Sequence, residues 1–476
     1  MAPPILVWFR RDLRLDDHAA LSAATDTGRP VIPVFIYDDV LTGYGACPKW
    51  RMGLGVEMFS KRLATLGSRL ILRKGSALPV LTALINETGA TDVFWSRAYD
   101  PEAIARDSDV KAALKRDGIV AKSFKGHVLF EPWDVQTGAG GPYRVFTPFW
   151  RSVRERPVGP VLPPVSKISS PQDWPESDSL ANWGLGDVMG PGAEIVKRHV
   201  CVGETAALER AETFFHQKAH TYAARRDIPA VDGTSSLSED LTYGEVSVRR
   251  LWQLGMRARD AGVDGAEAFL RQLVWRDFAY HLAYHTPHIL TDSWRPEWRS
   301  FPWKTTRGPD AEAWQQGRTG VPFVDAAMRE LYVTGRVHNR ARMISASFLT
   351  KHLLTHWSVG RDWYGECLVD WDPAVNALGW QWVAGSGPDA APYFRIFNPE
   401  TQSAKFDPAG TYVDRWIAEE RAVPHSDALS FFDAAPRSWG LSADSAYPKP
   451  LVTLAAGRER ALKAYQQHRG SKEDFH

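Results

Sequence analysis

Two patterns of hydrophobic residues divide the chain. In the first 130 residues, short apolar runs rich in valine, isoleucine and aromatic residues alternate with segments of helical spacing. The strand-like runs are 5–9, 31–37, 69–73, 92–99 and 120–124, and the helical segments are 17–25, 49–66, 77–88 and 101–117. This alternation predicts a parallel, doubly wound α/β sheet with helices on both faces. Asp16 and Ser76 are suited to cap helices, and Pro101 suits a first helical turn.

The second half of the chain has a helical pattern. Helical periods cover 203–216, 245–262, 265–285, 322–334, 338–357 and 360–369. Seven prolines lie between 157 and 191, where both periodicities fade. We expect this connector to be wrapped over the surface, with a disordered hinge as the alternative. The predicted organisation is an α/β domain in 1–130, an interdomain connector in 131–201 and an all-α domain in 202–476.

Composition excludes several classes of protein. Hydrophobic residues make up 44% of the chain and charged residues 24%, which is typical of a folded domain. Three cysteines cannot form a disulfide framework, and no apolar run approaches the ~20 residues of a membrane span. The short apolar run at the N-terminus precedes its arginines, unlike a secretory signal, so we expect a cytoplasmic protein and no membrane contact. The net charge of +1 means that a polyanion would need a local basic patch.

Familiar nucleotide and metal motifs are missing. The first strand runs into RRDLRLDDH without a glycine, so the chain has no G-x-G-x-x-G loop, and it has no P-loop. His281, His285 and His288 recur at helical spacing, as do His352 and His356, but neither group has the acidic partner of an H-E-x-x-H site. We therefore expect no bound metal.

Tryptophan is unusually frequent. The chain has 20 tryptophans, and ten of them lie between 275 and 382. Core packing is the simplest explanation for any single one, because an indole buries a large apolar area. A dense cluster also suits electron transfer, stacking on bases or a flavin pocket.

Two short segments carry candidate polar chemistry. GTSSLS (233–238) precedes a helical stretch and can hold a pyrophosphate, although an ordinary serine-rich turn is the simpler explanation of this segment alone. In HNRARM (338–343), Arg340 and Arg342 point apart by roughly 200° on a helix. One can meet solvent or DNA, while an inward arginine needs a carboxylate, which DWD (370–372) can supply.

Taken together, several ordered blocks resemble the photolyase/cryptochrome flavoprotein family. They are VWFRRDLRLDDH at the start, YRVFTPFW (143–150), RRDIPAVDGTSSLS (225–238), QLVWRDF (272–278), AWQQGRTGVPFVDAAMREL (313–331), HNRARMISASFL (338–349), DWDPAVNALGWQW (370–382) and APYFRIFNPETQSAKFD (391–407). The class resembled most is the microbial cyclobutane pyrimidine dimer DNA photolyase.

The resemblance implies an FAD in the helical half. Tyr222 and the segment of Thr234, Ser235, Ser236, Leu237 and Ser238 match its phosphate and ribitol holders. The other matching positions are Phe269, Arg276, Asn339, Arg342, Asp370, Asp372 and Asn376. Asn376 matches the residue facing flavin N5; asparagine there is the photolyase choice and cannot donate a carboxyl proton. Ser236 stands where the family often has a basic residue, which puts one phosphate contact in doubt.

The resemblance also assigns an electron path and a DNA site. Trp380, Trp357 and Trp303 match a hopping chain from the flavin to the surface, and Trp275 and Trp382 match the walls around a flipped-out dimer. The other implied DNA contacts are Arg226, Gln272, Asn339, Arg340, Met343 and Gln402. The implied partner is damaged DNA carrying a pyrimidine dimer, bound by a monomer.

Gln272 departs from this pattern, because dimer photolyases usually carry a glutamate there. A glutamine keeps an N–H donor but cannot transfer a proton, so it predicts slower dimer repair or a changed role. One stabilising donor is worth roughly 1–3 kcal/mol, or about one to two orders of magnitude in rate. Gln272 also favours the alternatives of a cryptochrome-like blue-light photoreceptor or a (6-4) photolyase, while Met343 opposes the latter and Asn376 the former.

A second, antenna chromophore is also implied, in the N-terminal sheet domain. Ligands of such sheets bind at the carboxyl ends of the strands. The acidic residue of folate-binding relatives falls at Ala103, with Glu102 beside it. A folate in another geometry, a deazaflavin or no antenna all remain open. The sequence thus predicts a light-driven lyase that splits cyclobutane pyrimidine dimers with reduced FAD.

Overall fold

The computed structural model describes residues 2–473, which form two compact units. Unit 1 comprises residues 2–188, Cys201–Ala223 and Ser235–Pro287, and unit 2 comprises Met189–Val200, Ala224–Thr234 and residues 288–473. Most of the predicted connector and the first part of the predicted helical domain therefore belong to unit 1. The boundaries of the three predicted domains stay a prediction, and residues 474–476 of the third lie outside the described residues.

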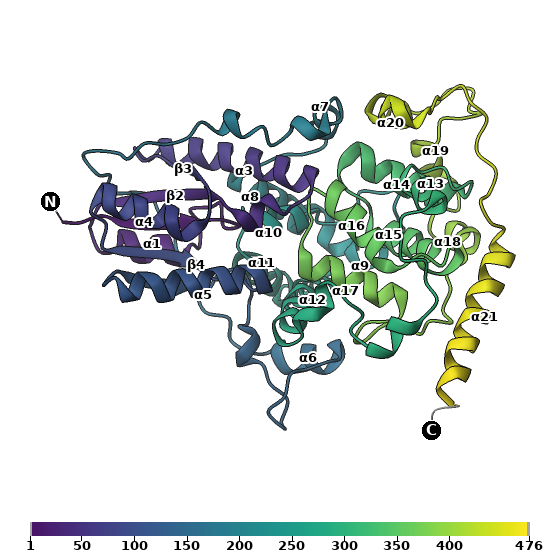
Figure 1. Cartoon of the computed structure of the whole chain (residues 1–476), viewed down its shortest axis with the longest axis horizontal. Coiled ribbons are helices and arrows are strands. Elements are labelled where there is room, and N and C mark those ends of the chain that lie inside the picture. Colours follow the sequence, from purple (N-terminus) through teal and green to yellow (C-terminus); the bar gives the residue numbers. More distant parts are fainter. Residues whose placement is uncertain (1, 474–476) are drawn as a thin grey trace. The chain divides into compact units, whose positions relative to one another are not determined.

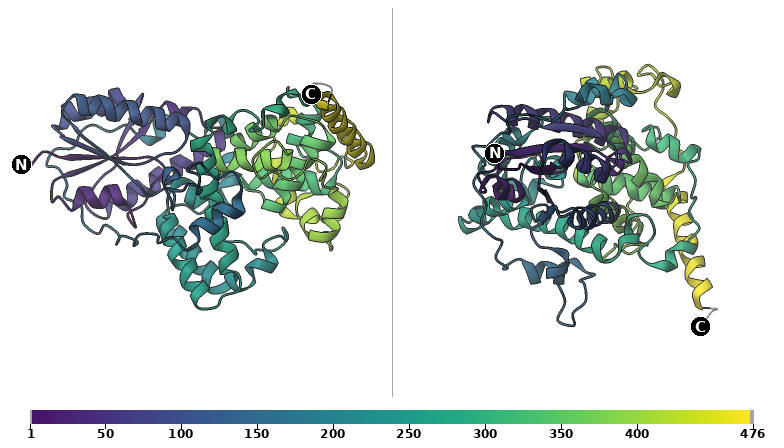
Figure 2. Two further views of the ribbon diagram at one scale, coloured as in Figure 1. Left: turned by 90° about the horizontal axis from the view of Figure 1, so that it is seen from below. Right: turned by 60° about the vertical axis from the view of Figure 1, so that its left-hand side comes forward.

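Unit 1 contains a five-stranded parallel sheet of order β3-β2-β1-β4-β5. The strands are β1 (Ile5–Phe9), β2 (Val31–Tyr37), β3 (Ile71–Lys74), β4 (Asp92–Ser96) and β5 (Val120–Phe124). Ile5 of the central β1 lies opposite both Val31 and Asp92. Every residue of β1 and β4 is buried, as expected for strands with helices on both faces (Figures 1 and 2). The predicted doubly wound sheet is confirmed.

The helices of unit 1 follow the strands and then continue beyond the sheet. They are α1 (Ala19–Thr25), α2 (Asp39–Thr42), α3 (Ala46–Ala64), α4 (Ala77–Thr88), α5 (Pro101–Arg116), α6 (Phe146–Val153), α8 (Glu204–Thr213), α10 (Ser238–Tyr243), α11 (Val248–Asp260) and α12 (Ala266–His285), with a π-helical turn at Phe214–Lys218 and α9 (Tyr222–Arg225) at the boundary between the units. Pro101 begins α5, as predicted.

The two predicted helix caps are wrong in detail. His18, not Asp16, caps α1, because its ring accepts a hydrogen bond from the Leu21 amide. Asp16 instead binds the Arg250 guanidinium at 2.6 Å, a partner distant in sequence. Ser76 precedes α4, but its hydroxyl donates to Asp39 rather than accepting from the helix.

The proline-rich connector is tied to the sheet by main-chain hydrogen bonds. Val165 donates to Leu15, Val31 donates to Ser169 and Asp178 donates to Leu72. The segment has little regular structure, yet these bonds hold it against unit 1, so it is not a free hinge.

Unit 2 is helical. Its helices are α7 (Gly192–Lys197), α13 (Pro309–Gln315), α14 (Pro322–Thr334), α15 (Asn339–Ser347), α16 (Trp357–Cys367), α17 (Pro373–Ala384), α18 (Pro399–Phe406), α19 (Thr411–Trp416), α20 (Ser426–Ala434) and α21 (Leu454–Glu473). Its buried core includes Trp298, Trp303, Trp314, Trp357, Trp380 and Trp416, so packing accounts for many of the indoles.

The single helix predicted over 338–357 is wrong. Helix α15 ends at Ser347, a π-helical turn covers Phe348–His352, and Leu354 has a left-handed backbone with φ of +49°. Thr355 then pairs with Lys304 in a short β-bridge, and α16 begins at Trp357. Pairing with a segment about fifty residues earlier thus overrides a continuous helical pattern.

Charged side chains are buried where helices meet the sheet in unit 1. Arg51 of α3 is fully buried; it binds Glu239, and it pairs with both oxygens of Glu245 at 3.0 and 2.6 Å. Both carboxylates are also buried. A buried charge without its partner is costly, so this guanidinium holds α3 and α10 together.

We predict that Arg51→Met lowers the free energy of unfolding of unit 1 by about 3–5 kcal/mol, because two buried carboxylates lose their counter-charge. Urea unfolding followed by circular dichroism measures it. Lys61→Met is the control: Lys61 pairs with Glu57 on the exposed face of the same helix and should cost about 0.5 kcal/mol or less. Equal, small losses for both variants would contradict the assigned role.

Candidate functional site

Helix α12 of unit 1 carries a half-buried tryptophan held by a second aromatic ring. Trp275 stacks face to face on Phe146, the first residue of α6, with ring centroids 3.7 Å apart and planes 7° apart. Gln272 lies one turn earlier, half-buried, and its amide reaches only the Ala268 carbonyl of its own helix at 3.4 Å. The structure thus places Gln272 next to Trp275 on one face of α12.

Two further predicted residues of α12 face the interior of unit 1. Arg276 is 9% exposed and donates to the His127 carbonyl at 2.6 Å. Burial and the Arg276 charge hold the pKa of His127 well below its usual range, so its ring stays neutral beside the guanidinium. Phe269 is buried between Phe214 and Tyr222, whose rings lie 4.9 and 6.3 Å away.

The segment before α10 contains the predicted phosphate holders. Ser236 and Ser238 are exposed, Ser235 is half-buried and Leu237 is buried. Ser236 has a left-handed backbone with φ of +53°, which is uncommon for a residue with a side chain. Such strain is often kept where the backbone must present polar groups to a ligand.

Helix α15 of unit 2 separates its two arginines, as its helical spacing predicts. Arg342 donates to both oxygens of Asp370 at 2.9 Å and to the Val337 carbonyl at 2.8 Å. Arg340 turns to Asp227, with 2.9 Å between the charged groups. The predicted arginine–carboxylate pair is therefore formed, but Arg342 is not the more buried arginine, since its side chain is 27% exposed and that of Arg340 is 17% exposed. Arg340 also has a carboxylate partner, which sequence reasoning missed.

Four more predicted site residues lie near Arg342 and Asp370 in the sequence, on α15 and at the start of α17. Asn339 is exposed and its amide contacts the Met343 sulfur at 3.7 Å. Asp372 is buried and caps α17 by accepting from the Val375 amide at 3.1 Å. Asn376 is half-buried, and its amide donates to the Arg361 carbonyl at 3.2 Å.

The three tryptophans of the predicted electron path are all buried in unit 2. Trp380 is 2% exposed, and its indole N–H has no hydrogen-bond partner within residues 2–473. The His356 ring lies 5.3 Å from Trp357 and 5.2 Å from Trp303. Trp303 is only 6% exposed, and its ring centroid lies 5.5 Å from that of Trp298. Trp357, His356, Trp303 and Trp298 thus form one aromatic series, whereas Trp380 packs against Tyr364 at 4.9 Å and Trp314 at 6.0 Å.

The remaining predicted DNA contacts are Trp382 on α17, Gln402 on α18 and Arg226, all half-buried in unit 2. Thr234, at the end of a segment of unit 2, is also half-buried. Across the described part of the chain, no group of three histidine, cysteine or acidic side chains is arranged to hold a metal ion. His281 instead accepts from the Tyr143 amide, and His285 donates to the Pro132 carbonyl.

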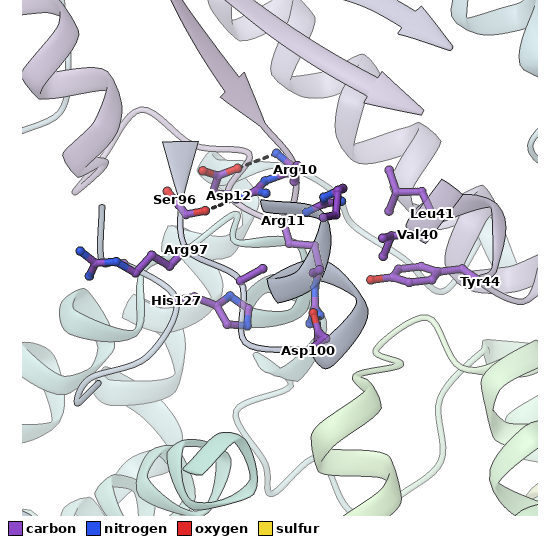
Figure 3. A pocket seen from close by; sticks show the side chains of 14 residues that line it. Arg10, Arg11, Asp12, Val40, Leu41, Tyr44, Ser96, Arg97, Asp100 and His127 are labelled. Carbon is purple, nitrogen blue, oxygen red and sulfur yellow. Dashed lines mark hydrogen bonds and ion pairs between the residues drawn. The ribbon is translucent and has the colours of Figure 1, made fainter. Parts of the chain in front are cut away.

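A hollow lies at the carboxyl ends of the strands in unit 1, where the sheet topology predicts a ligand (Figure 3). We call it the N-terminal hollow; it encloses about 550 Å³ when its open mouth is counted. Its lining includes Arg10, Arg11, Asp12, Val40, Leu41, Tyr44, Ser96, Arg97, Asp100, Ala103, Arg106 and His127.

Arginines dominate the chemistry of the N-terminal hollow. Arg10 and Arg106 lie 4.4 and 4.8 Å from the Trp8 ring, and Asp107 binds both. Ala103 lies in the lining, whereas Glu102 is exposed. Arg10 directly follows β1, and Arg106 lies in the second turn of α5, after β4. Their places after strands are a signal that sequence reasoning could have used to name them.

Family models match two regions of the chain, one in each half. A family model described as DNA photolyase matches residues 5–167, and one described as the FAD binding domain of DNA photolyase matches residues 269–467. A deoxyribodipyrimidine photo-lyase of Agrobacterium fabrum is 43% identical over 470 residues, covering 97% of each chain. Cryptochrome-2 of Arabidopsis thaliana is 34% identical over 98% of this chain and 79% of its own.

The chain belongs to the DNA photolyase family. Two solved photolyases share the fold. A bacterial class III photolyase from Agrobacterium tumefaciens has a TM-score of 0.90 and 40% identity, covering 99% of this chain and 98% of its own. An archaeal photolyase from Sulfolobus tokodaii, solved with two FAD molecules, has a TM-score of 0.80 and 28% identity, covering 98% and 100%. The family is one of lyases and includes cryptochromes.

The donor set of this photolyase-family chain fits an FAD. Unit 2 offers the Asn376 amide, the Arg342–Asp370 pair and the buried, unpartnered indole N–H of Trp380. Unit 1 offers the hydroxyl-rich segment around Ser236. Amides and ion pairs suit the polar edge of a flavin, and hydroxyls with main-chain amides suit phosphates.

The photolyase helix α12 is anchored by an aspartate that sequence reasoning missed. Asp277 is 2% exposed and accepts from the Leu129 and Phe130 amides at 2.8 and 3.0 Å. Its other oxygen has no partner among the described residues. Burial raises the pKa of Asp277 to about 7. As pH rises from about 4 to about 7, Asp277 ionises in the unfolded chain but keeps its proton in the folded one, so the free energy of unfolding falls over that range.

We predict that Asp277→Asn removes this pH dependence. Relative to the variant, the wild type should lose about 2–4 kcal/mol of unfolding free energy between pH 4 and pH 8. Urea unfolding across that range measures the difference, with the exposed Asp260→Asn as the control. A wild type and variant with parallel pH profiles would show that Asp277 is not protonated in the fold.

Proposed function

We propose that this protein repairs DNA by splitting cyclobutane pyrimidine dimers with light. The observation that carries the proposal is the half-buried Trp275, fixed by Phe146 at 3.7 Å and placed one turn after Gln272. A rigid ring beside a hydrogen-bonding amide suits a base that has left the stack, because the ring can stack and the amide can bind the base edge. The relative from Agrobacterium fabrum, named a deoxyribodipyrimidine photo-lyase, supports it.

FAD, when bound and reduced, supplies the electron for ring splitting after absorbing blue or near-ultraviolet light. Tyr222 and residues 234–238 would hold its phosphates and ribitol, and Arg276, Arg342, Asp370, Asp372 and Asn376 its ring. The Asn376 carboxamide carries no acidic proton to give away. Trp380, Trp357 and Trp303 would conduct electrons inward to restore the reduced cofactor.

Several side chains would hold the lesion. Trp275 and Trp382 offer ring faces, while Asn339, Arg340, Met343, Arg226 and Gln402 would contact the dimer or its backbone. Gln272 can donate a hydrogen bond to a pyrimidine carbonyl through its amide, but it has no proton to transfer. A cytoplasmic location and a monomeric state stay predictions. No helix in residues 2–473 is long and apolar enough to cross a membrane.

Gln272 also supports a second candidate, a cryptochrome-like photoreceptor with weak or no repair. The 34% identity with cryptochrome-2 of Arabidopsis thaliana is consistent with it. A (6-4) photolyase would share Gln272, but Met343 stands where that class carries a histidine.

We predict that the reduced protein repairs DNA carrying one thymine dimer under blue light, and that Gln272→Glu repairs it about 10- to 100-fold faster. The reason is that a protonated carboxyl stabilises the dimer radical anion by roughly 1–3 kcal/mol more than an amide. Product formation per flash, measured by chromatography, tests this.

Gln466→Glu, an exposed change on α21, is the control and should leave the rate unaltered. Equal rates for the wild type and Gln272→Glu would remove Gln272 from the lesion site. No repair by either protein would contradict the repair proposal and favour the photoreceptor.

We further propose that the N-terminal hollow holds an antenna chromophore. Its arginines, each paired with a carboxylate, suit the polar edge of a ring system, and Tyr44 offers an aromatic face. Ala103 provides no carboxylate where folate-binding relatives carry one. This favours a deazaflavin or a flavin over a folate in the usual geometry. The Sulfolobus tokodaii photolyase, with its two FAD molecules, is a precedent for a flavin.

We predict that Ala103→Trp abolishes binding of the second chromophore while FAD content is unchanged, because the indole fills the lining. Absorbance and fluorescence of chromophores released by denaturation measure both. Ala112→Trp, on the exposed face of the same helix, should retain both chromophores. Retention of the second chromophore by Ala103→Trp would place its site elsewhere.

A further inference from the structure

Arg340, which the proposed function assigns to DNA, is already engaged by a carboxylate. Its guanidinium lies 2.9 Å from the Asp227 carboxylate and 4.2 Å from the centre of the Phe406 ring. The Arg340 side chain is 17% exposed and that of Asp227 is 41% exposed. Stacking on Phe406 fixes the plane of the guanidinium, so the partly exposed arginine is held in one orientation beside Asp227.

The Arg340 Nε group is buried and has no hydrogen-bond partner within the described residues. Asp227 therefore satisfies only part of the guanidinium, which carries five N–H donors in a planar fork. A phosphate offers more acceptor oxygens than one carboxylate contact uses, and arginine binds phosphates through two parallel hydrogen bonds. Because the unpartnered Nε is buried, a DNA phosphate can reach the guanidinium only at its exposed N–H groups, where the Asp227 carboxylate already lies, so the two anions compete for Arg340.

The charge of Asp227 also acts on its surroundings. Asp227 lies beside the start of α15, where Arg340 is the second residue and His338 the cap. An anion here is favoured by the positive end of the helix dipole. It neutralises the patch that the sequence predicts to be the basic centre of DNA binding, in a chain whose net charge is only +1.

We propose that Asp227 is a gate for DNA binding: it occupies Arg340 in the free protein and must yield the guanidinium to a DNA phosphate. This inference rests on the proposed function. The carboxylate lowers the affinity for any DNA backbone, so the protein is not held on undamaged DNA, where no flipped dimer adds contacts. Asp227 is a positioning residue, since it acts through Arg340.

The test is DNA binding by Asp227→Asn, measured by fluorescence anisotropy at several salt concentrations with an undamaged duplex and a duplex carrying one thymine dimer. The affinity for undamaged DNA should rise about three- to tenfold, as expected for release of one partly exposed ion pair. The slope of log affinity against log salt should steepen by up to about 0.9, because Arg340 of the variant neutralises one phosphate, whereas the wild-type Arg340 and Asp227 together carry no net charge.

Asp414→Asn is the matched control. Asp414 is an exposed partner of Arg421 in the same unit, at 2.7 Å, so the variant changes the net charge equally at another surface. It should leave affinity and slope close to the wild-type values. This control distinguishes an effect of releasing Arg340 from the effect of a more positive net charge on DNA affinity.

An unchanged slope in Asp227→Asn, or weaker binding to both duplexes, would overturn the gate. Asp227 would then only stabilise the fold through its ion pair with Arg340. Equal strengthening by Asp414→Asn would overturn the gate as well. If the wild-type protein binds neither duplex, the proposed function itself fails. If the wild type binds DNA and Asp227→Asn binds it equally well, only the gate fails.

Discussion

The helical unit depends on one close approach between two helices. A β-carbon added at Gly360 of α16 would lie 2.1 Å from the Trp380 ring of α17, far inside van der Waals contact. Only glycine lets the two helices approach this closely. The approach sets Trp380 against Tyr364 at 4.9 Å and Trp314 at 6.0 Å, and it places Trp357 at the start of α16 and Asn376 within α17. The proposed cofactor contacts and the proposed electron path therefore share one packing constraint.

The sequence predicted the sheet well because its strands are buried on both faces. Strands 5–9 and 31–37 were predicted with their observed bounds, since continuous apolar runs are a local signal. Strand 120–124 also has its predicted bounds, although it is partly exposed. The break in the helix over 338–357 could not be predicted, because it depends on Lys304 pairing with Thr355. Asp16 failed as a cap for a similar reason, since Arg250 takes its carboxylate.

Among the site residues, too, local contacts were predicted and contacts between distant segments were missed. The Arg342–Asp370 pair was predicted in two steps. Helical spacing and the DWD segment indicated that one of the two arginines needs a carboxylate, and the family resemblance pointed to Arg342 and Asp370. The Asp227–Arg340, Arg276–His127 and Asp277–Leu129 contacts were missed, because each joins residues more than a hundred positions apart. Helical spacing tells which side chains diverge, but it does not identify the distant partner that each one meets.

The two units contribute different chemistry to the proposed reaction. Unit 1 supplies a rigid aromatic wall and an arginine-rich hollow, and unit 2 supplies the buried indoles and the partly neutralised arginines of α15. The most direct measurement of light-driven repair is the action spectrum of dimer loss, compared with the absorption spectrum of the reduced holoprotein. The account predicts that the two spectra coincide and that dimers persist in the dark. Dimer loss in the dark, or at wavelengths that the bound chromophores do not absorb, would contradict it.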